Sequence, residues 1–254
     1  MAVFSFDGHM GKWSYRQVSG VNNPQYQEEW VETMLDEIAQ KAPKGSSVLD
    51  VGAGEGRFRG LIQSYGFLYR GQDFAAHIPA EDTSAGPQAK RWEYTELEFV
   101  CDILATPADA ESYGVVCTEV LEHVPDPAAA FEKIWSLTKP GGFLAVTVPF
   151  VSLMHQAPYW FSAGLSPFWF AHHAFRLGIT DFEIVVHGDY FDLMRQEIER
   201  LLERKAKFHS RLVFPFVVAN RLAMRVARKH SSTSKRQMGA FGVSFLVRKP
   251  PTVG

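Results

Sequence analysis

Residues 48–58 of this 254-residue chain read VLDVGAGEGRF. The order is an apolar strand, then a glycine-rich turn, then the start of a helix. Glycine lets the backbone adopt positive φ and approach a ligand closely, and the unpaired N–H groups of the following helix can donate hydrogen bonds to it. The stretch therefore predicts a ligand-binding turn after the first strand of an α/β unit.

The spacing of the glycines limits the kind of ligand. A dinucleotide-binding loop carries the pattern G-x-G-x-x-G, whereas Gly56 comes one residue early and Arg57 stands in the expected place. This disfavours a pyrophosphate site, and a nicotinamide-dependent oxidoreductase is the weaker alternative. A cofactor without phosphate needs close approach to the backbone of Gly52, Ala53 and Gly54.

Carboxylates stand at the ends of the first three predicted strands, at Asp50, Asp73 and Asp102. Because open α/β sheets bind ligands beyond the carboxyl ends of their strands, we expect all three to face one crevice, with Asp73 on the ribose hydroxyls. Any one of them could merely cap the helix that follows it. Their coincidence with the glycine turn favours a cofactor site.

Short β-rich runs alternate with helical patterns, which is typical of an α/β fold with helices on both faces of a mostly parallel sheet. We predict a Rossmann-like sheet of seven strands, at residues 47–51, 67–73, 98–102, 114–118, 143–148, 181–186 and 241–248. Helix starts are marked by a capping side chain followed by proline at residues 23–24, 126–127 and 166–167. Pro79, Gly86 and Pro87 leave no clear helix after Asp73.

Length and composition fit one domain over residues 1–254, with 46% hydrophobic and 21% charged residues. Its expected parts are an N-terminal helical cap (1–44), a Rossmann-like core (45–190), a basic helical insertion (191–238), and the last strand and tail (239–254). No signal peptide or membrane-spanning run is evident. Cys101 and Cys117 lie in apolar runs, as buried reduced thiols do. We therefore favour the cytoplasm and expect neither a disulfide nor a metal.

Three stretches resemble the class I S-adenosylmethionine-dependent methyltransferase family, in particular its type 11 and type 23-like branches. They are residues 48–58, 71–73 and 115–149, and the most specific parts read TEVLEHVPDP (118–127) and KPGG (139–142). The resemblance implies S-adenosyl-L-methionine as cofactor and S-adenosyl-L-homocysteine as product. It places Gly52 and Gly54 at the amino acid end of the cofactor, Asp73 on the ribose, Asp102 and Ile103 at the adenine, and Thr118 beside the sulfonium. Asp50, Ala53 and Phe74 complete the expected cofactor site.

Two histidines are candidates for activating the methyl acceptor. Methyl transfer is an in-line displacement, in which positioning alone supplies about 7 to 11 kcal/mol. A histidine base adds about 10² to 10⁴ in rate when the acceptor is a hydroxyl. His123 follows the fourth predicted strand and His155 follows the fifth. Each has a structural alternative: His123 can bond a loop carbonyl, and His155 can be a packing residue.

Aromatic residues are concentrated from His155 to Phe175, and the loop in this stretch is a candidate lid or acceptor wall. The portion from Pro149 to Trp169 resembles a subset of bacterial methyltransferases associated with surface glycan or secondary-metabolite assembly, which implies O- or N-methylation of a small-molecule or glycan-type acceptor. Within its helix, Phe168, His172 and Phe175 share one face, and we expect this face to pack on the sheet.

Basic residues concentrate in one segment, residues 195–236, which holds 12 Lys/Arg against 3 Asp/Glu and is thus +9, while the remainder is −11. One predicted helix has a basic row on one side and an apolar row on the opposite side. The basic row is Arg221, Arg225, Arg228 and Lys229, and the apolar row is Val218, Leu222 and Val226. Such a row is either an ordinary solvated face or a peripheral contact with an anionic membrane surface or an acidic partner. Nucleic acid is disfavoured, because the charge is confined to this insertion.

A methyltransferase best explains the glycine spacing, the carboxylates and residues 118–127 together. A nicotinamide-dependent oxidoreductase and a non-catalytic scaffold protein that binds the cofactor are the two alternatives.

Overall fold

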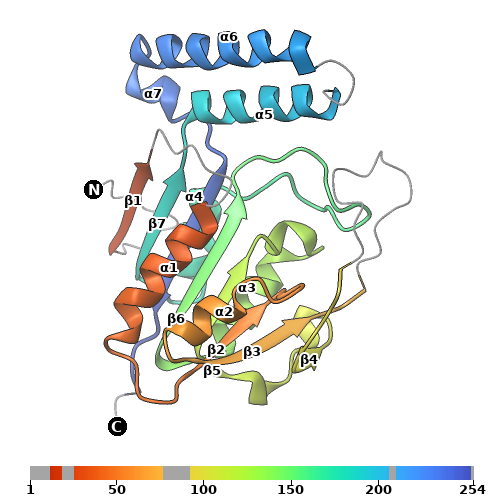
Figure 1. Cartoon of the computed structure of the whole chain (residues 1–254). Helices are drawn as coiled ribbons and strands as arrows, with labels where there is room; N and C mark the ends of the chain where they lie inside the picture. Colours follow the sequence, from red (N-terminus) through yellow and green to blue (C-terminus); the bar gives the residue numbers. More distant parts are fainter. Residues whose placement is uncertain (1–11, 19–25, 77–91, 206–209, 253–254) are drawn as a thin grey trace.

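A computed structural model describes residues 12–18, 26–76, 92–205 and 210–252, which contain one eight-stranded sheet with helices on both faces (Figure 1). The strands are β1 (Lys12–Val18), β2 (Ser47–Val51), β3 (Leu68–Asp73), β4 (Phe99–Val100), β5 (Ser112–Thr118), β6 (Thr138–Pro149), β7 (Asp181–His187) and β8 (Gly242–Arg248). They are ordered β1-β7-β8-β6-β5-β2-β3-β4. β8 is antiparallel to both neighbours, and all other pairs are parallel.

The predicted fold class is confirmed, but the strand count is wrong by one. β1 pairs with β7 along its whole length, from Lys12 opposite Asp181 to Val18 opposite His187. Its sequence, KWSYRQV, mixes polar and aromatic residues, because an edge strand has a neighbour on one side only and gives a weaker apolar pattern than a central strand. The third predicted strand, 98–102, shortens to the two residues of β4.

The α-helices are α1 (Tyr26–Ala39), α2 (Arg59–Ser64), α3 (Pro127–Ser136), α4 (Pro167–Arg176), α5 (Tyr190–Lys205), α6 (Ser210–Lys229) and α7 (Thr233–Arg236). Short 3₁₀ turns are η2 (Ile103–Ala105), η3 (Ala108–Ala110) and η4 (Leu121–His123). Two predicted caps are confirmed: Asp126 accepts from the Ala129 N–H at 3.0 Å, and Ser166 from the Trp169 N–H at 3.2 Å. The start at residues 23–24 and the breakers at 79–87 lie outside the described residues.

Two apolar layers enclose the central strands, one on each face of the sheet. Along β6, Leu144, Val146 and Val148 belong to the layer that includes α3 and α4, whereas Phe143 and Ala145 belong to the layer with α1 and α2. A strand covered on both faces is a nearly continuous apolar run. This is why residues 143–148 can be recognised as a buried strand.

The face of α4 that packs inward differs from the predicted one. Phe168 is exposed and His172 is half-buried, so of the three predicted core residues only Phe175 is buried. The buried face also includes Phe170, and the small side chains of Ala171 and Ala174 let the helix lie close to the sheet.

Residues 188–241, between β7 and β8, form the α5–α7 insertion, which confirms a helical insertion before the last strand. α5 and α6 lie side by side beyond the carboxyl end of β7, and α6 is the outer helix (Figure 1). None of the described helices is long and apolar enough to cross a membrane.

Candidate functional site

The carboxyl ends of β6, β5, β2, β3 and β4 follow one another along the sheet and form a single edge, here called the carboxyl edge. Every predicted site residue lies at the end of one of these strands or in the segment directly after it: Asp50, Gly52, Ala53, Gly54, Asp73, Phe74, Asp102, Ile103, Thr118, His123 and His155. Residues that are far apart in sequence therefore meet in one region.

The glycine turn after β2 presents backbone rather than side chains. Gly52 and Gly54 have φ values of 69° and 55°, in the left-handed region that favours glycine. A side chain at Gly52 would overlap Val120, and a Cβ at Gly54 would lie 3.2 Å from the Trp92 ring. The Ala53 N–H donates to the Gln72 carbonyl at 2.9 Å and ties the turn to β3.

Asp73 joins the end of β3 to this turn. Its buried carboxylate accepts hydrogen bonds from the Gly54 N–H at 2.9 Å and the Ala75 N–H at 2.8 Å, one on each oxygen. Each carboxylate oxygen can accept a second hydrogen bond. Asp73 is therefore held by the backbone and retains the capacity to accept ribose hydroxyls.

The other two strand-end carboxylates have structural partners. Asp50 is buried and accepts from the Tyr69 hydroxyl at 3.1 Å, and burial raises its pKa to about 7. Asp102 accepts from the Leu104 N–H at 2.8 Å and caps η2, which is the alternative considered above. Ile103 is buried in that turn, while Phe74 is partly exposed.

Trp92 is a site residue that sequence reasoning missed. Its ring lies against Gly54, and the Glu93 N–H donates to Glu55 of the glycine turn at 3.1 Å. No local motif marks Trp92, because its place against the turn depends on the tertiary fold.

Glu119 follows β5 and is held by side chains from two other elements. The Tyr26 and Thr147 hydroxyls both donate to its Oε1, at 3.1 and 3.0 Å, and Thr118 immediately before it is half-buried. Burial raises the pKa of Glu119, whereas the hydrogen bonds from Thr147 and Tyr26 lower it. Its positive φ of 56° turns the chain sharply at the end of the strand.

Glu122 is fully buried in η4, and neither of its carboxyl oxygens has a hydrogen-bond partner among the described residues. Burial raises its pKa well above the usual range, and the charge of Glu119 raises it further. Its backbone carbonyl accepts from the N–H groups of Phe161 and Ser162 at 3.0 and 3.2 Å. The loop after β6 is thus attached to η4.

The two predicted histidines lie together. Their ring centroids are 4.8 Å apart, with an interplanar angle of 82°. Nδ1 of His123 bonds the Tyr159 carbonyl, and Nδ1 of His155 bonds the Leu153 carbonyl at 2.9 Å. Because a carbonyl only accepts, each Nδ1 carries a proton, and Nε2 carries the lone pair of the neutral ring.

Glu122 lies beside the two histidines. Nε2 of His123 lies 3.6 Å from Oε1 of Glu122. One ligand atom from each of Glu122, His123 and His155 lies within 4.8 Å of the other two. This set can accept a proton or hold a cation.

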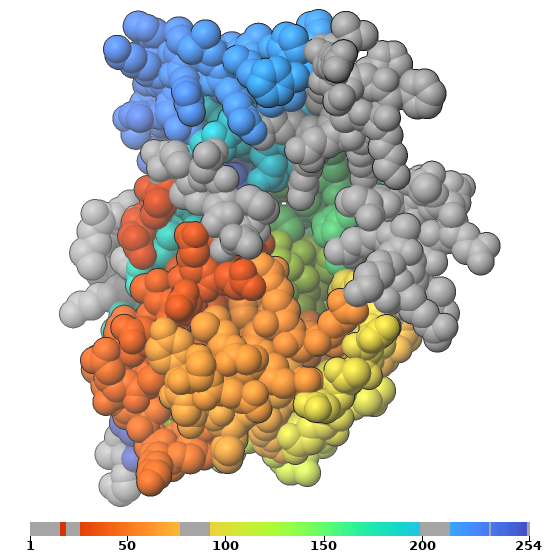
Figure 2. Space-filling model, viewed as in Figure 1, coloured from red at the N-terminus to blue at the C-terminus, as the bar shows by residue number. Residues whose placement is uncertain are grey.

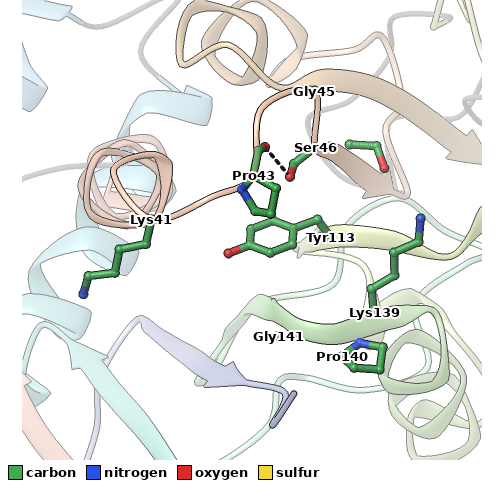
Figure 3. Close-up of a pocket in the computed structure, with 9 residues that line it drawn as sticks. Lys41, Pro43, Gly45, Ser46, Tyr113, Lys139, Pro140 and Gly141 are labelled. Carbon is green, nitrogen blue, oxygen red and sulfur yellow. Dashed lines mark hydrogen bonds between the residues drawn. The ribbon is translucent and has the colours of Figure 1, made fainter. Parts of the chain in front are cut away.

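A pocket of about 470 Å³ lies at the opposite end of the sheet (Figure 3). It is lined by the segment between α1 and β2 and by the starts of β2, β5 and β6, and the Ser46 hydroxyl donates to the Pro43 carbonyl in that segment, at 2.7 Å. Open α/β sheets bind ligands at the carboxyl ends of their strands. We therefore take the carboxyl edge, and not this pocket, as the candidate functional site.

Similarities to curated proteins cover about half of the chain. A ubiquinone biosynthesis O-methyltransferase of Xylella fastidiosa (strain 9a5c) is 34% identical over 117 residues, which are 44% of this chain and 46% of that protein. The enzyme of the same name from Albidiferax ferrireducens is 32% identical over 116 residues, 45% of this chain and 43% of that protein. The matched segment thus spans less than half of either relative.

Solved structures share the fold at low sequence identity. A putative sarcosine dimethylglycine methyltransferase from Galdieria sulphuraria has a TM-score of 0.52 at 16% identity, covering 88% of this chain and 85% of that one. The [4+2]-cyclase SpnF has a TM-score of 0.51 at 19% identity, covering 96% and 87%. A cyclase on this fold illustrates that fold alone does not decide the reaction.

Family membership rests on a longer match. A family model described as a methyltransferase domain matches residues 24–181, which is more than half of the chain. The range includes the glycine turn, Asp73, and the segment 118–127 that carries Glu122 and His123. This chain belongs to the class I S-adenosylmethionine-dependent methyltransferase family.

Proposed function

We propose that this chain transfers a methyl group from S-adenosylmethionine to a hydroxyl group of a small molecule. The observation that carries the proposal is the His123–His155 pair at the carboxyl edge, because two imidazoles suit an acceptor that must lose a proton. The O-methyltransferase names of the relatives support the same acceptor atom.

The residues of the carboxyl edge fit the cofactor. The glycine turn offers backbone at Gly52 and Gly54, Asp73 offers a fixed carboxylate for the ribose, and Phe74 and Ile103 offer apolar contacts for the adenine. When bound, S-adenosylmethionine supplies an electrophilic methyl group on a sulfonium. The protein then has to hold the acceptor oxygen in line with that methyl group.

Tyr159 links the cofactor side of this region to the acceptor side. Its ring packs edge-on against Phe74 with centroids 5.0 Å apart, and its carbonyl accepts the hydrogen bond from Nδ1 of His123. That hydrogen bond orients the imidazole so that Nε2 can take a proton from the acceptor hydroxyl. The loop after β6 therefore supplies both the wall of the acceptor site and the group that orients His123.

Turnover by the full chain tests the proposal. We expect S-adenosylhomocysteine to form with phenols, aliphatic alcohols or a simple glycoside, and not with amines of matching size. His123→Ala should lower the rate by about 10² to 10⁴ with cofactor affinity unchanged. The control is His230→Ala, an exposed residue directly after α6. Methylation of amines only, or full activity of His123→Ala, would refute the proposal.

We also propose that α6 docks the enzyme on an anionic membrane surface. Four apolar residues, spaced four apart along α6, form a row whose members are 47% to 69% exposed: Phe214, Val218, Leu222 and Val226. Arg221, Arg225 and Lys229 are exposed beside this row, and α6 forms an outer surface of the molecule (Figure 2). Exposed apolar and basic rows on one helix match the interface of an anionic bilayer.

Arg228 does not belong to this surface, although the sequence pattern groups it with the basic row. Its guanidinium forms ion pairs with the buried carboxylates of Asp189 and Asp192. A test of docking must leave it in place.

Co-sedimentation with vesicles tests the docking proposal. The triple replacement of Arg221, Arg225 and Lys229 by Gln keeps helix propensity and removes only charge. Binding to anionic vesicles should weaken by about 1 kcal/mol per residue replaced and should also weaken between low and physiological salt. Equal binding by both proteins, or equal binding to neutral vesicles, would refute an electrostatic contact.

A further inference from the structure

We propose that Glu122, His123 and His155 bind a divalent transition-metal cation at the carboxyl edge, beside the acceptor site. This inference rests on the proposed hydroxyl acceptor only for the role of the cation, and not for the site itself. It replaces the expectation of no metal, which was drawn from the cysteines alone.

The side chain of Glu122 is fully buried, and no described residue donates a hydrogen bond to either of its carboxyl oxygens. Burying a carboxylate without compensation is so costly that such groups are normally paired or bound to a metal. Glu119 next to it is already satisfied by the Tyr26 and Thr147 hydroxyls. Glu122 is therefore a carboxyl group that a proton must neutralise in the free protein and that a cation can neutralise instead.

The two histidine rings are held in the way that is usual for metal ligands. A metal-binding histidine usually donates the N–H of its other ring nitrogen to a carbonyl or carboxylate, which fixes the ring and its tautomer. His123 and His155 both do this through Nδ1, to the carbonyls of Tyr159 and Leu153. Nε2 of each ring is then the atom with the lone pair that a metal requires.

The three side chains already lie close together. One possible ligand atom from each of them lies within 4.8 Å of the other two. The ligands of a tetrahedral zinc ion are about 3.3 Å apart, so small side-chain movements bring the three side chains into coordination range. No backbone movement is needed to bring the ligands together, because the N–H groups of Phe161 and Ser162 donate to the Glu122 carbonyl and hold the loop of His155 next to η4.

The ligand set selects the class of metal. Two imidazoles and one carboxylate suit Zn²⁺, Mn²⁺, Fe²⁺ or Co²⁺, whereas Mg²⁺ and Ca²⁺ prefer oxygen ligands. Three protein ligands leave coordination positions open for an oxygen of the acceptor. A hydroxyl bound to such a cation ionises more readily, so when the cation is bound it replaces Nε2 of His123 as the group that promotes loss of the acceptor proton.

The transfer then balances without a further reactant. The acceptor O–H bond breaks and its proton passes to solvent. The oxygen electron pair forms the new C–O bond to the methyl carbon, and the C–S electron pair returns to sulfur. The products are a methyl ether and a thioether.

Calorimetric titration of the tag-free full chain with Zn²⁺ or Mn²⁺ tests the site without any acceptor. We expect one cation per chain. Glu122→Gln and His155→Gln should each weaken binding at least about 10-fold to 100-fold, and His230→Gln, outside the cluster, should leave it unchanged. Because Gln conserves the volume of Glu122, this variant should fold, and its melting temperature without metal should be no lower than that of the wild type.

The outcomes separate this inference from the proposed function. Failure of the wild type to bind either cation, equal binding by all variants, or equal affinity for Mg²⁺ would overturn the metal site, whatever the activity. A bound cation with no methylation of any hydroxyl would keep the site and refute the proposed function. Removal of the cation by a chelator should lower the methylation rate without changing S-adenosylhomocysteine affinity.

Discussion

Two regions of this molecule bury carboxylates, and they do so in opposite ways. In the α5–α7 insertion, Asp189 and Asp192 are buried but paired with Arg228 from the same insertion. At the carboxyl edge, Asp50 and Glu122 are buried, and no described Lys or Arg forms an ion pair with either.

A buried carboxylate in an ion pair and a buried carboxyl group without one have different roles in a protein. A charge that the chain itself neutralises holds two helices together, whereas a charge left uncompensated lowers stability unless a proton or a ligand neutralises it. Strongly perturbed carboxylates in one region are therefore a sign of a functional site. The comparison can be tested from either side by single substitutions.

The largest effect is expected in the insertion. Arg228→Gln removes the ion pairs of Arg228 with Asp189 and Asp192 and should cost about 3 to 5 kcal/mol of unfolding free energy, because both carboxylates are buried. Asp192 keeps a longer ion pair with Arg195, at 4.0 Å. Urea denaturation measures the loss, and hydrogen exchange locates it in α5 and α6. The matched control is the exposed Arg225→Gln, expected within about 0.5 kcal/mol of wild type. Equal stability of the two variants would mean that the pair contributes nothing.

Asp50→Asn should raise the free energy of unfolding, whereas Arg228→Gln lowers it. Folded Asp50 keeps its proton up to a pKa of about 7, while the unfolded chain releases it near pH 4. Wild-type stability therefore falls as pH rises through this range. The variant should be more stable by up to about 4 kcal/mol at pH 8 and no more stable at pH 4.

Thermal unfolding at both pH values checks the Asp50 prediction. The control is Asp36→Asn on the exposed face of α1. A variant that is destabilised at pH 8 would show that Asp50 is held as a stabilising anion, contrary to the comparison.

Asp73→Ala tests the third buried carboxylate of the carboxyl edge, which is held by backbone N–H groups. Loss of its contacts should weaken S-adenosylhomocysteine binding by about 1.5 to 3 kcal/mol. Calorimetry measures the affinity, and Asp73→Asn separates the charge from the hydrogen bonds. Undiminished affinity of Asp73→Ala would move the ribose site elsewhere.

What the sequence predicts well here is local. The glycine turn, the caps at Asp126 and Ser166, and the doubly buried β6 each depend on neighbouring residues, and the structure has them as expected. The predicted inward face of α4 is wrong, because the helix buries Phe170, Ala171 and Ala174 and leaves Phe168 exposed.

Contacts between distant segments could not be read from the sequence. Nothing near Glu122 indicates that it is fully buried, and nothing near Arg228 distinguishes it from the exposed Arg225. His123 and His155 were both candidates, but their adjacency depends on the loop after β6 returning to η4.

The antiparallel pairing of β7 with β8 has an evolutionary consequence. A short turn suffices to join two neighbouring antiparallel strands, so the α5–α7 insertion is an addition that the sheet does not require. It also holds its own helices together, because Asp189, Asp192 and Arg228 all lie within it. Relatives could lengthen, exchange or lose this segment while the residues of the carboxyl edge stay unchanged, and one catalytic core could thereby acquire different cellular attachments.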